Sequence, residues 1–338
     1  MKLAVLATLL LACNGPRSSD ALAATVSQGS SAATHDPVVI RFADPGNAGI
    51  LAYAKREGIL KKNLEPVNAT IEWVPAAGAF SANFEAMNAG AINAAGGAIS
   101  PIIGALSHNL KFKIFAISDP GGIRAAGVIS PAQSSIRTLK DLVGKRVAVN
   151  LAAHGDYVLL KALSDEGIPA SEVNRLPIQP PDAAAAFATG KIDAWSTFGV
   201  FFATAVRNGA HVLVTEDQIH SDDVGVLAAN ASVLEANPEA FRLLIKVSEE
   251  LTLEARKDPE KFQNVFTKQG PTAVSGDELT RVVEETRELP AYRIPTAADR
   301  ARIANVEAMF FDNHSIDRNI AVDEIVFDVD RAVAAHGR

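Results

Sequence analysis

A short turn at residues 152–156, "AAHGD", combines residue types that suit the binding of an anion. It lies between a short apolar run and a helical pattern, and a helix that begins directly after a buried strand presents free backbone N–H groups and a partial positive charge. His154 can donate a ring N–H there, and Gly155 leaves the backbone open to a ligand. A surface position or a local cap is the structural alternative for His154, and we assign Asp156 to capping the helix.

Three further segments open predicted helices with small or helix-starting residues. Asp44 is expected to cap the first of these helices near Asn47 or to accept a hydrogen bond from a ligand amine, and Gly49 leaves its backbone accessible. Ser100 is expected to cap the second helix, with Pro101 in its first turn. The three segments are "DPGNAG" (44–49), "GGAISP" (96–101) and "QPPD" (179–182).

Strands and helices alternate from Val38 onward, which is typical of parallel α/β layers. Open sheets of this kind bind ligands outside the carboxyl ends of their strands, where the predicted helix starts converge. The sequence "DPGG" at 119–122 separates two such series, so we predict two α/β lobes. Strands are expected at 38–43, 69–74, 91–95, 111–118, 125–130, 146–150, 172–178, 193–198, 211–215 and 224–230, and the helices between them at 50–57, 82–88, 101–107, 138–142, after 152–156, at 182–188 and up to 207.

Beyond residue 230 the pattern becomes helical, with Asn237 as the cap and Pro238 in the first turn of a long helix. This part is expected to cover the first lobe, with further helical patterns at 258–269, 276–287 and 299–312. The predicted domains are residues 1–36 as signal and tether, 37–120 with 231–338 as the first lobe, and 121–230 as the second lobe.

The composition is that of a soluble globular protein, with 338 residues of which 48% are hydrophobic and 21% charged. A net charge of −7 and the lack of a Lys/Arg stripe exclude nucleic acid as a partner. The sequence contains no HExxH, GxSxG or GxGxxG motif, and we predict no catalytic residue, no metal and no cofactor. A scattered Ser/His/Asp site is the enzymatic alternative.

The apolar run at residues 3–12 is far shorter than the roughly 20 residues that span a bilayer, so we interpret it as an export signal. "LLAC" at 10–13 resembles a bacterial lipobox, which predicts lipidation of Cys13 at the outer face of the cytoplasmic membrane. Cleavage after Ala23, which releases a protein into the periplasm, is the alternative. Residues 24–36 are predicted to be a flexible tether.

The chain resembles the aliphatic-sulfonate and taurine-binding proteins of ABC importers over residues 38–330. The resemblance implies a type II periplasmic-binding-protein fold, in which two lobes close on a small ligand whose sulfonate rests on helix N-termini and loop amides. It also implies a membrane permease and an ATPase as partners, and we expect a monomer. The segments that carry it, by their order and spacing, are "ILAYAKREGIL", "EAMNAGAIN", "LKDLVGKRVAVN", "GDYVLLKAL", "AAAFATGKIDAW", "NPEAFRLLI" and "VEAMFFDNHSID".

Two departures from the family pattern affect the expected ligand. Residues 152–153 are Ala-Ala where the family commonly has Gly-Ser, and residues 197–201 follow "DAW" without an acid that could receive a taurine amine. We therefore expect an apolar or aromatic-tailed sulfonate in contact with Trp195, Phe198 and Phe80, although core packing is the alternative for Trp195. A nitrate-like anion, a thiamine-precursor pyrimidine, or a sensory domain of the same fold are the alternative interpretations.

Overall fold

The computed structural model describes residues 36–75, 80–118 and 126–337. The predicted export signal, Cys13, the cleavage site after Ala23 and almost all of the tether therefore lie outside the described residues, as does the break at 119–122. Residues 37–338 form one compact unit. Among the described residues, no helix is long and apolar enough to cross a membrane.

The first sheet has six strands in the order β11-β4-β10-β3-β1-β2. β1 pairs in parallel with β2 and β3, whereas β10 is antiparallel to both β3 and β4, and β11 is antiparallel to β4. The chain thus returns to the first sheet at β10, within the range that we placed in the second lobe. The strands are β1 (Val38–Ala43), β2 (Ala69–Val74), β3 (Ala94–Ala98), β4 (Phe112–Ser118), β10 (Gly225–Asn230) and β11 (Tyr292–Arg293).

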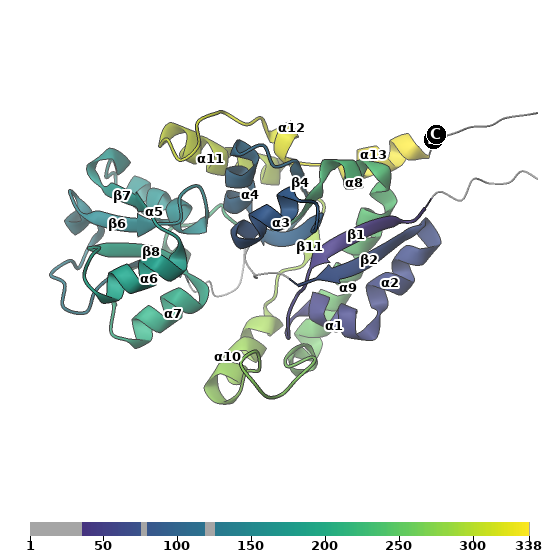
Figure 1. Cartoon of the computed structure of the whole chain (residues 1–338), viewed down its shortest axis with the longest axis horizontal. Helices are drawn as coiled ribbons and strands as arrows, with labels where there is room; N and C mark the ends of the chain where they lie inside the picture. Colours follow the sequence, from purple (N-terminus) through teal and green to yellow (C-terminus); the bar gives the residue numbers. More distant parts are fainter. Residues whose placement is uncertain (1–35, 76–79, 119–125, 338) are drawn as a thin grey trace, which may run out of the picture. The chain divides into compact units, whose positions relative to one another are not determined.

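Helices cover both faces of the first sheet (Figure 1). On one face α1 (Ile50–Glu57), α2 (Ile59–Leu64) and α9 (Pro238–Lys257) form one apolar cluster with β1, β2, β4 and β10, in which Phe241 of α9 contacts Phe115 of β4. On the other face α4 (Ile99–Ser107) and α11 (Ala297–Asp312) form a second apolar cluster. Figure 1 shows α9 and α2 beside the edge formed by β1 and β2.

Local signals account for where these helices begin and end. α1 ends at Gly58, whose φ of 64° is the left-handed conformation that glycine adopts at little cost. The Asn237 side chain caps α9 by accepting the Ala240 N–H at 3.2 Å, with Pro238 in the first turn as predicted. The short helix α2 directly after Gly58 was not predicted.

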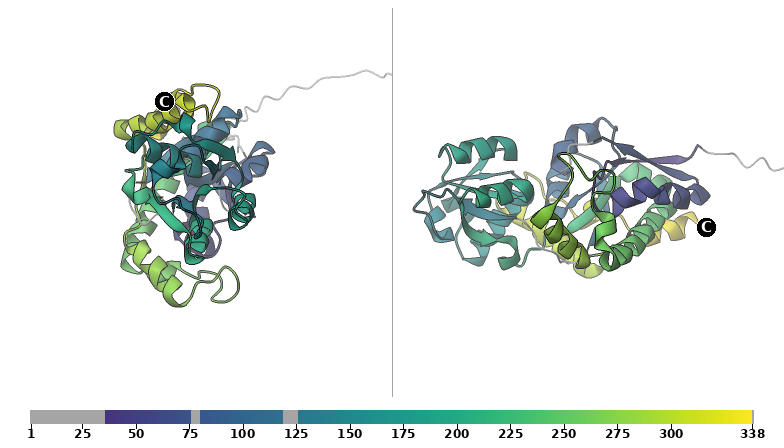
Figure 2. Two further views of the ribbon diagram at one scale, coloured as in Figure 1. Left: turned by 90° about the vertical axis from the view of Figure 1, so that its left-hand side faces the viewer. Right: turned by 90° about the horizontal axis from the view of Figure 1, so that it is seen from below.

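The second sheet is built from one continuous stretch of chain, drawn in teal in Figure 2. Its strands follow the order β7-β6-β8-β5-β9. β6 is parallel to β7 and β8, and β5 is antiparallel to β8 and β9. The predicted helix at 138–142 is a 3₁₀ turn, Leu139–Leu142. The elements are β5 (Ala126–Ser130), β6 (Arg146–Val149), β7 (Asn174–Pro177), β8 (Ala194–Phe198), β9 (His211–Thr215), α5 (His154–Asp165), α6 (Pro180–Ala188) and α7 (Gly199–Arg207).

The helix predicted at 258–269 is wrong, because only the 3₁₀ turn Pro259–Phe262 forms there. The chain that follows is a loop held by Asn47, whose Nδ2 donates to the carbonyl oxygens of Thr267 at 2.8 Å and Thr272 at 3.0 Å. Asn47 Oδ1 accepts the Phe266 N–H at 2.8 Å. The remaining helices are α3 (Phe84–Asn88), α8 (Ala231–Ala236), α10 (Gly276–Arg287), α12 (Val322–Ile325) and α13 (Val329–His336).

A close backbone contact joins α4 to the turn that precedes α5. A Cβ added to Gly104 would lie 2.1 Å from the carbonyl oxygen of Ala152, whose own φ is +51°. We expect Gly104→Ala to lower the free energy of unfolding by about 1 to 3 kcal/mol, because a backbone atom cannot rotate away. Gly96→Ala is the control, since its Cβ meets Leu227 Cδ2 at an ordinary 3.6 Å. Chemical denaturation would contradict the prediction if both variants lost equal stability.

Candidate ligand site

A cavity of about 710 Å³ lies at the carboxyl ends of strands from both sheets. Its lining includes the last residues of β3, β4 and β8, together with the first residues of four helices. Backbone N–H groups of a first helical turn have no partner inside the helix, so such starts offer donors to a ligand. The helix starts in the lining are Gly49–Leu51 of α1, Ala98 and Pro101 of α4, Ala153 and His154 of α5, and Phe198 and Gly199 of α7.

Three of the four predicted helix openings therefore reach the cavity. The fourth, at 179–182, precedes α6 and is absent from the cavity lining. The start of α7 lines the cavity instead, although the sequence predicted Phe198 there only as an apolar wall. Of the individually predicted residues, the lining contains Gly49, Phe80, His154 and Phe198.

Other predicted residues lie outside this lining and have structural contacts. Asp44 accepts the Gly46 N–H at 3.0 Å and forms an ion pair with Lys55. Although burial opposes the shift, the hydrogen bonds from Lys55 and Gly46 lower the pKa of Asp44 below its usual value. Asn47 holds the 264–274 loop, as described above. Neither residue is part of the cavity lining.

Trp195 and Gly155 serve the packing of the second lobe. Trp195 is 2% exposed, with ring centroids 5.7 Å from Phe187 and 6.0 Å from Phe201, so the core alternative holds for it. Gly155 brings α5 close to β8, because an added Cβ would lie 2.6 Å from the Ser196 carbonyl oxygen. Neither residue belongs to the cavity lining.

Ser100 is not the cap of α4, because the residue at that position is Ala98. The Ser100 N–H instead donates to Asp223 Oδ1 at 2.8 Å, and its hydroxyl donates to Asp223 Oδ2. Asp223 is fully buried and lies in the segment that leads into β10. The positive N-terminal end of α4 is thus occupied by a carboxylate of the protein itself.

His154 joins that carboxylate to a second one. Its Nδ1 lies 2.7 Å from Asp223 Oδ2 and its Nε2 lies 3.0 Å from Glu216 Oε2, while Glu216 is 1% exposed. Burial alone would lower the pKa of His154, but the hydrogen bonds that its ring donates to Asp223 and Glu216 raise the pKa to about 10. The ring is an imidazolium at neutral pH, and both of its N–H groups are donated to carboxylates. The predicted hydrogen bond from His154 to a ligand anion therefore lacks a donor in this arrangement.

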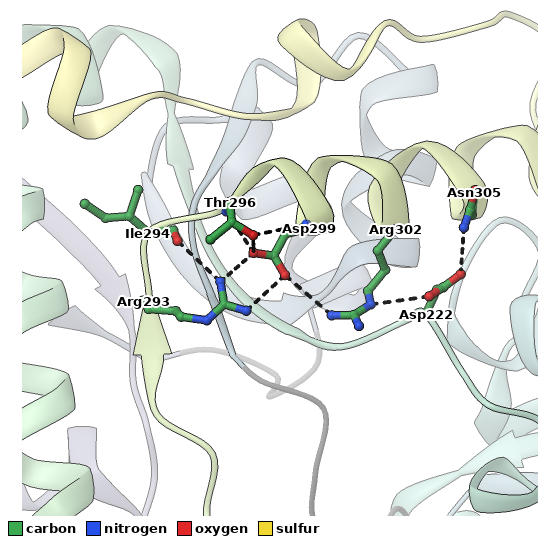
Figure 3. A network of polar contacts seen from close by, with 7 residues as sticks. All are labelled: Asp222, Arg293, Ile294, Thr296, Asp299, Arg302 and Asn305. Carbon is green, nitrogen blue, oxygen red and sulfur yellow. Dashed lines mark hydrogen bonds and ion pairs between the residues drawn. The ribbon is translucent and has the colours of Figure 1, made fainter.

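The segment before β10 is held from its other side as well. The Asp222 N–H donates to the Tyr157 hydroxyl at 2.9 Å, and the Asp222 carboxylate accepts from Arg302 Nε at 3.3 Å and Asn305 Nδ2 at 3.1 Å. Figure 3 shows Arg302 between Asp222 and Asp299 at the start of α11. These contacts of Asp222 hold the segment that carries Asp223 in place at the cavity.

Asp299 connects this wall to β11. Its carboxylate forms an ion pair with Arg293 and accepts a hydrogen bond from the Thr296 hydroxyl at 2.7 Å (Figure 3). Burial would raise the pKa of Asp299, but these hydrogen bonds hold it well below its usual range. The strand β11 and the start of α11 are therefore tied together next to the cavity.

Part of the cavity lining comes from the C-terminal part of the chain, which the sequence did not predict. Glu285 of α10, Leu289, Pro290 and Tyr292 belong to the lining. The amphipathic pattern of 276–287 signalled a helix but carried no indication that this helix reaches the ligand cavity. No acid follows "DAW" at 197–201, as the sequence indicated, but Glu285 enters the lining from this distant segment. Glu216 and Asp223 enter it from the segment between β9 and β10.

The architecture of the chain is that of a known fold. Residues 107–262 match the family described as "NMT1/THI5 like". The fold is the predicted type II periplasmic-binding-protein fold, with two α/β lobes and helices from the C-terminal part. It is similar to that of the alkanesulfonate-binding protein SsuA of Xanthomonas axonopodis pv. citri bound to MOPS, with a TM-score of 0.71 at 20% identity over 87% of this chain and 99% of that one.

Particular relatives confirm the resemblance found in the sequence. The chain is 24% and 29% identical, each over 198 residues, to two proteins of Bacillus subtilis and Escherichia coli that carry provisional names as aliphatic sulfonates-binding proteins. These matches cover 58% and 57% of this chain and span 59% of the length of each relative. The desulfurization enzyme DszB shares the fold more distantly, with a TM-score of 0.55 at 14% identity over 88% of this chain and 99% of that one.

Proposed function

We propose that this chain is an extracytoplasmic solute-binding protein of an ABC importer and that it binds an organosulfonate in the 710 Å³ cavity. The observation that carries the proposal is the convergence of four helix starts on one largely apolar cavity. Oriented backbone N–H groups bind an anion without a metal or a nucleophile. Because Asp223 occupies the start of α4, the starts of α1, α5 and α7 are the proposed places for the sulfonate group.

The size and chemistry of the cavity support an organic anion rather than an inorganic one. Its volume is within the roughly 300–1,000 Å³ range of pockets that enclose drug-sized ligands, and nitrate would leave most of it empty. Phe80, Phe198 and Tyr292 supply aromatic surface for the organic part. Glu285 also lines the cavity, and its Oε1 accepts a hydrogen bond from Arg281 Nη1. Its second carboxylate oxygen is the proposed acceptor for an amino group, so a sulfonate that carries an amine also fits.

The proposed activity is reversible binding without turnover. The relatives named above are binding proteins, and DszB is the distant exception. The chain has a single cysteine, Cys13, so its cavity offers no thiol nucleophile. Conversion of a bound sulfonate on prolonged incubation, followed by mass spectrometry, would contradict this part of the proposal.

The setting follows from the same similarity. The location proposed for this chain is the periplasm, and related binding proteins named as periplasmic support it. A permease and an ATPase are the proposed partners, and a monomer is the proposed oligomeric state. The first proposed lobe comprises residues 37–120 and 231–338, and the second comprises residues 121–230. Strand β10, at the end of the second range, pairs in the sheet of the first lobe. Anchoring through lipidated Cys13 and cleavage after Ala23 predict different masses for the mature protein, which mass spectrometry distinguishes.

A thermal-shift and calorimetry screen tests the ligand class. Residues 37–338 are used, with alkane- and arylsulfonates, taurine, nitrate and pyrimidines. A sulfonate at 100 times its Kd is expected to raise the free energy of unfolding by about 2.7 kcal/mol, because it binds only the folded state. A response to an uncharged pyrimidine together with no response to any sulfonate would refute the proposed ligand class.

A further inference from the structure

A smaller cavity of about 270 Å³ adjoins the main one beneath α10. The two cavities share part of their walls, at the start of α1 and the end of α10, and therefore lie next to each other. The shared residues are Ala48, Gly49, Ile50, Glu285 and Leu289. We call the smaller one the side cavity.

The side cavity is mainly apolar beyond the shared wall. Ala255 of α9, Phe262 and Val282 of α10 contribute apolar surface. The two neutral polar residues of its lining satisfy each other, since Gln263 Nε2 donates to Thr286 Oγ1 at 2.9 Å. A hydrocarbon segment therefore matches this lining better than a second charged group does.

We propose that the side cavity receives the distal apolar segment of an elongated amphiphilic sulfonate, whose headgroup lies at the helix starts of the main cavity. This inference rests on the proposed function and names the ligand's shape. The volume of about 270 Å³ is roughly nine times the ~30 Å³ share of one water molecule, which leaves room for a ring or a short alkyl chain. Ile50 and Leu289, which line both cavities, are apolar, and the proposed ligand passes between the two cavities beside them.

A chain-length series of linear alkanesulfonates, from ethane- to decanesulfonate, tests the proposal by calorimetry. In the unmodified protein, each additional methylene group that is buried against the apolar lining is expected to lower the Kd about fourfold. Val282→Phe fills the side cavity from a half-buried position. It is expected to weaken decanesulfonate at least tenfold and to leave ethanesulfonate within twofold.

Thr280→Phe is the matched control, because it adds the same ring at an exposed position of α10 that lines neither cavity. It is expected to reproduce the unmodified series. Should Val282→Phe fail to fold, Val282→Ala provides the opposite change. The enlarged side cavity should then extend the chain length at which affinity stops increasing by at least one methylene.

The outcomes separate the two proposals. Equal weakening of short and long sulfonates by Val282→Phe, or no gain in affinity with chain length, overturns the role of the side cavity while sulfonate binding stands. If no sulfonate of any length binds, the proposed function fails and this inference fails with it.

Discussion

The substitution His154→Gln is expected to lower the free energy of unfolding by about 3 to 5 kcal/mol at neutral pH. It removes the imidazolium between Asp223 and Glu216, which are 0% and 1% exposed. The two buried carboxylates would then lie in the protein interior without the cation that bridges them. Urea denaturation of the two proteins measures the difference.

The pH dependence of that difference has a definite sign. The folded-state pKa of His154 is raised to about 10, above the ~6.5 of an unfolded chain. The stabilisation is therefore complete below about pH 6.5 and is lost as the pH rises toward 10. The stability gap between the unmodified protein and His154→Gln should narrow over this window.

His211→Gln is the control for this experiment. Its Nε2 lies 2.8 Å from the Ala132 carbonyl oxygen, and the described structure gives it no ion pair. The control is expected to cost less than about 1 kcal/mol and to show no comparable narrowing. A His154→Gln gap that stays constant between pH 6 and 10 would rule out the imidazolium role.

A loss of similar size, about 3 to 5 kcal/mol, is expected for Asp156→Ala. Asp156 is fully buried in the first turn of α5 and accepts from Arg175 Nη1 at 2.8 Å, Ser315 Oγ at 2.6 Å and the Ala152 N–H at 3.0 Å. The substitution leaves the guanidinium of Arg175, which is 15% exposed, without this counter-charge. It also loosens the contact between α5 and the end of α11.

Asp193→Ala gives the matched comparison on the protein surface. Asp193 pairs with Arg146 at 3.0 Å, but the side chains are 30% and 48% exposed. Solvent screens such a pair, so the expected cost is below about 1 kcal/mol. Equal losses for Asp156→Ala and Asp193→Ala in denaturation at neutral pH would show that burial does not govern the Asp156 interaction.

Local patterns predicted most elements correctly because their signals lie within a few residues. Gly58 ends α1 and the Asn237-Pro238 pair begins α9 as expected. The expected cap at Ser100 was wrong, since residues 96–98, which we placed in a helix opening, are the last residues of strand β3. Small side chains suit both roles, and the sequence offers no local means to separate them.

The missing parts of the site depend on contacts between distant residues. Asp223 contacts Ser100, which lies 123 positions away in the sequence, and His154, which lies 69 positions away. No local spacing in the sequence therefore predicts this cluster. Glu285 reaches the cavity only because α10 lies next to the start of α1. Periodicity identified α10 as a helix, but which cavity a helix borders is decided by tertiary packing.

The position of β10 has a consequence for the order in which the chain assembles. β10 lies between β3 and β4, so the first sheet lacks a central strand until synthesis has passed residue 230. All strands of the second sheet lie within residues 126–215, and that sheet is complete earlier. Because pairing between residues far apart in the sequence slows folding, the second sheet should acquire hydrogen-exchange protection during refolding before β10 pairs with β3 and β4.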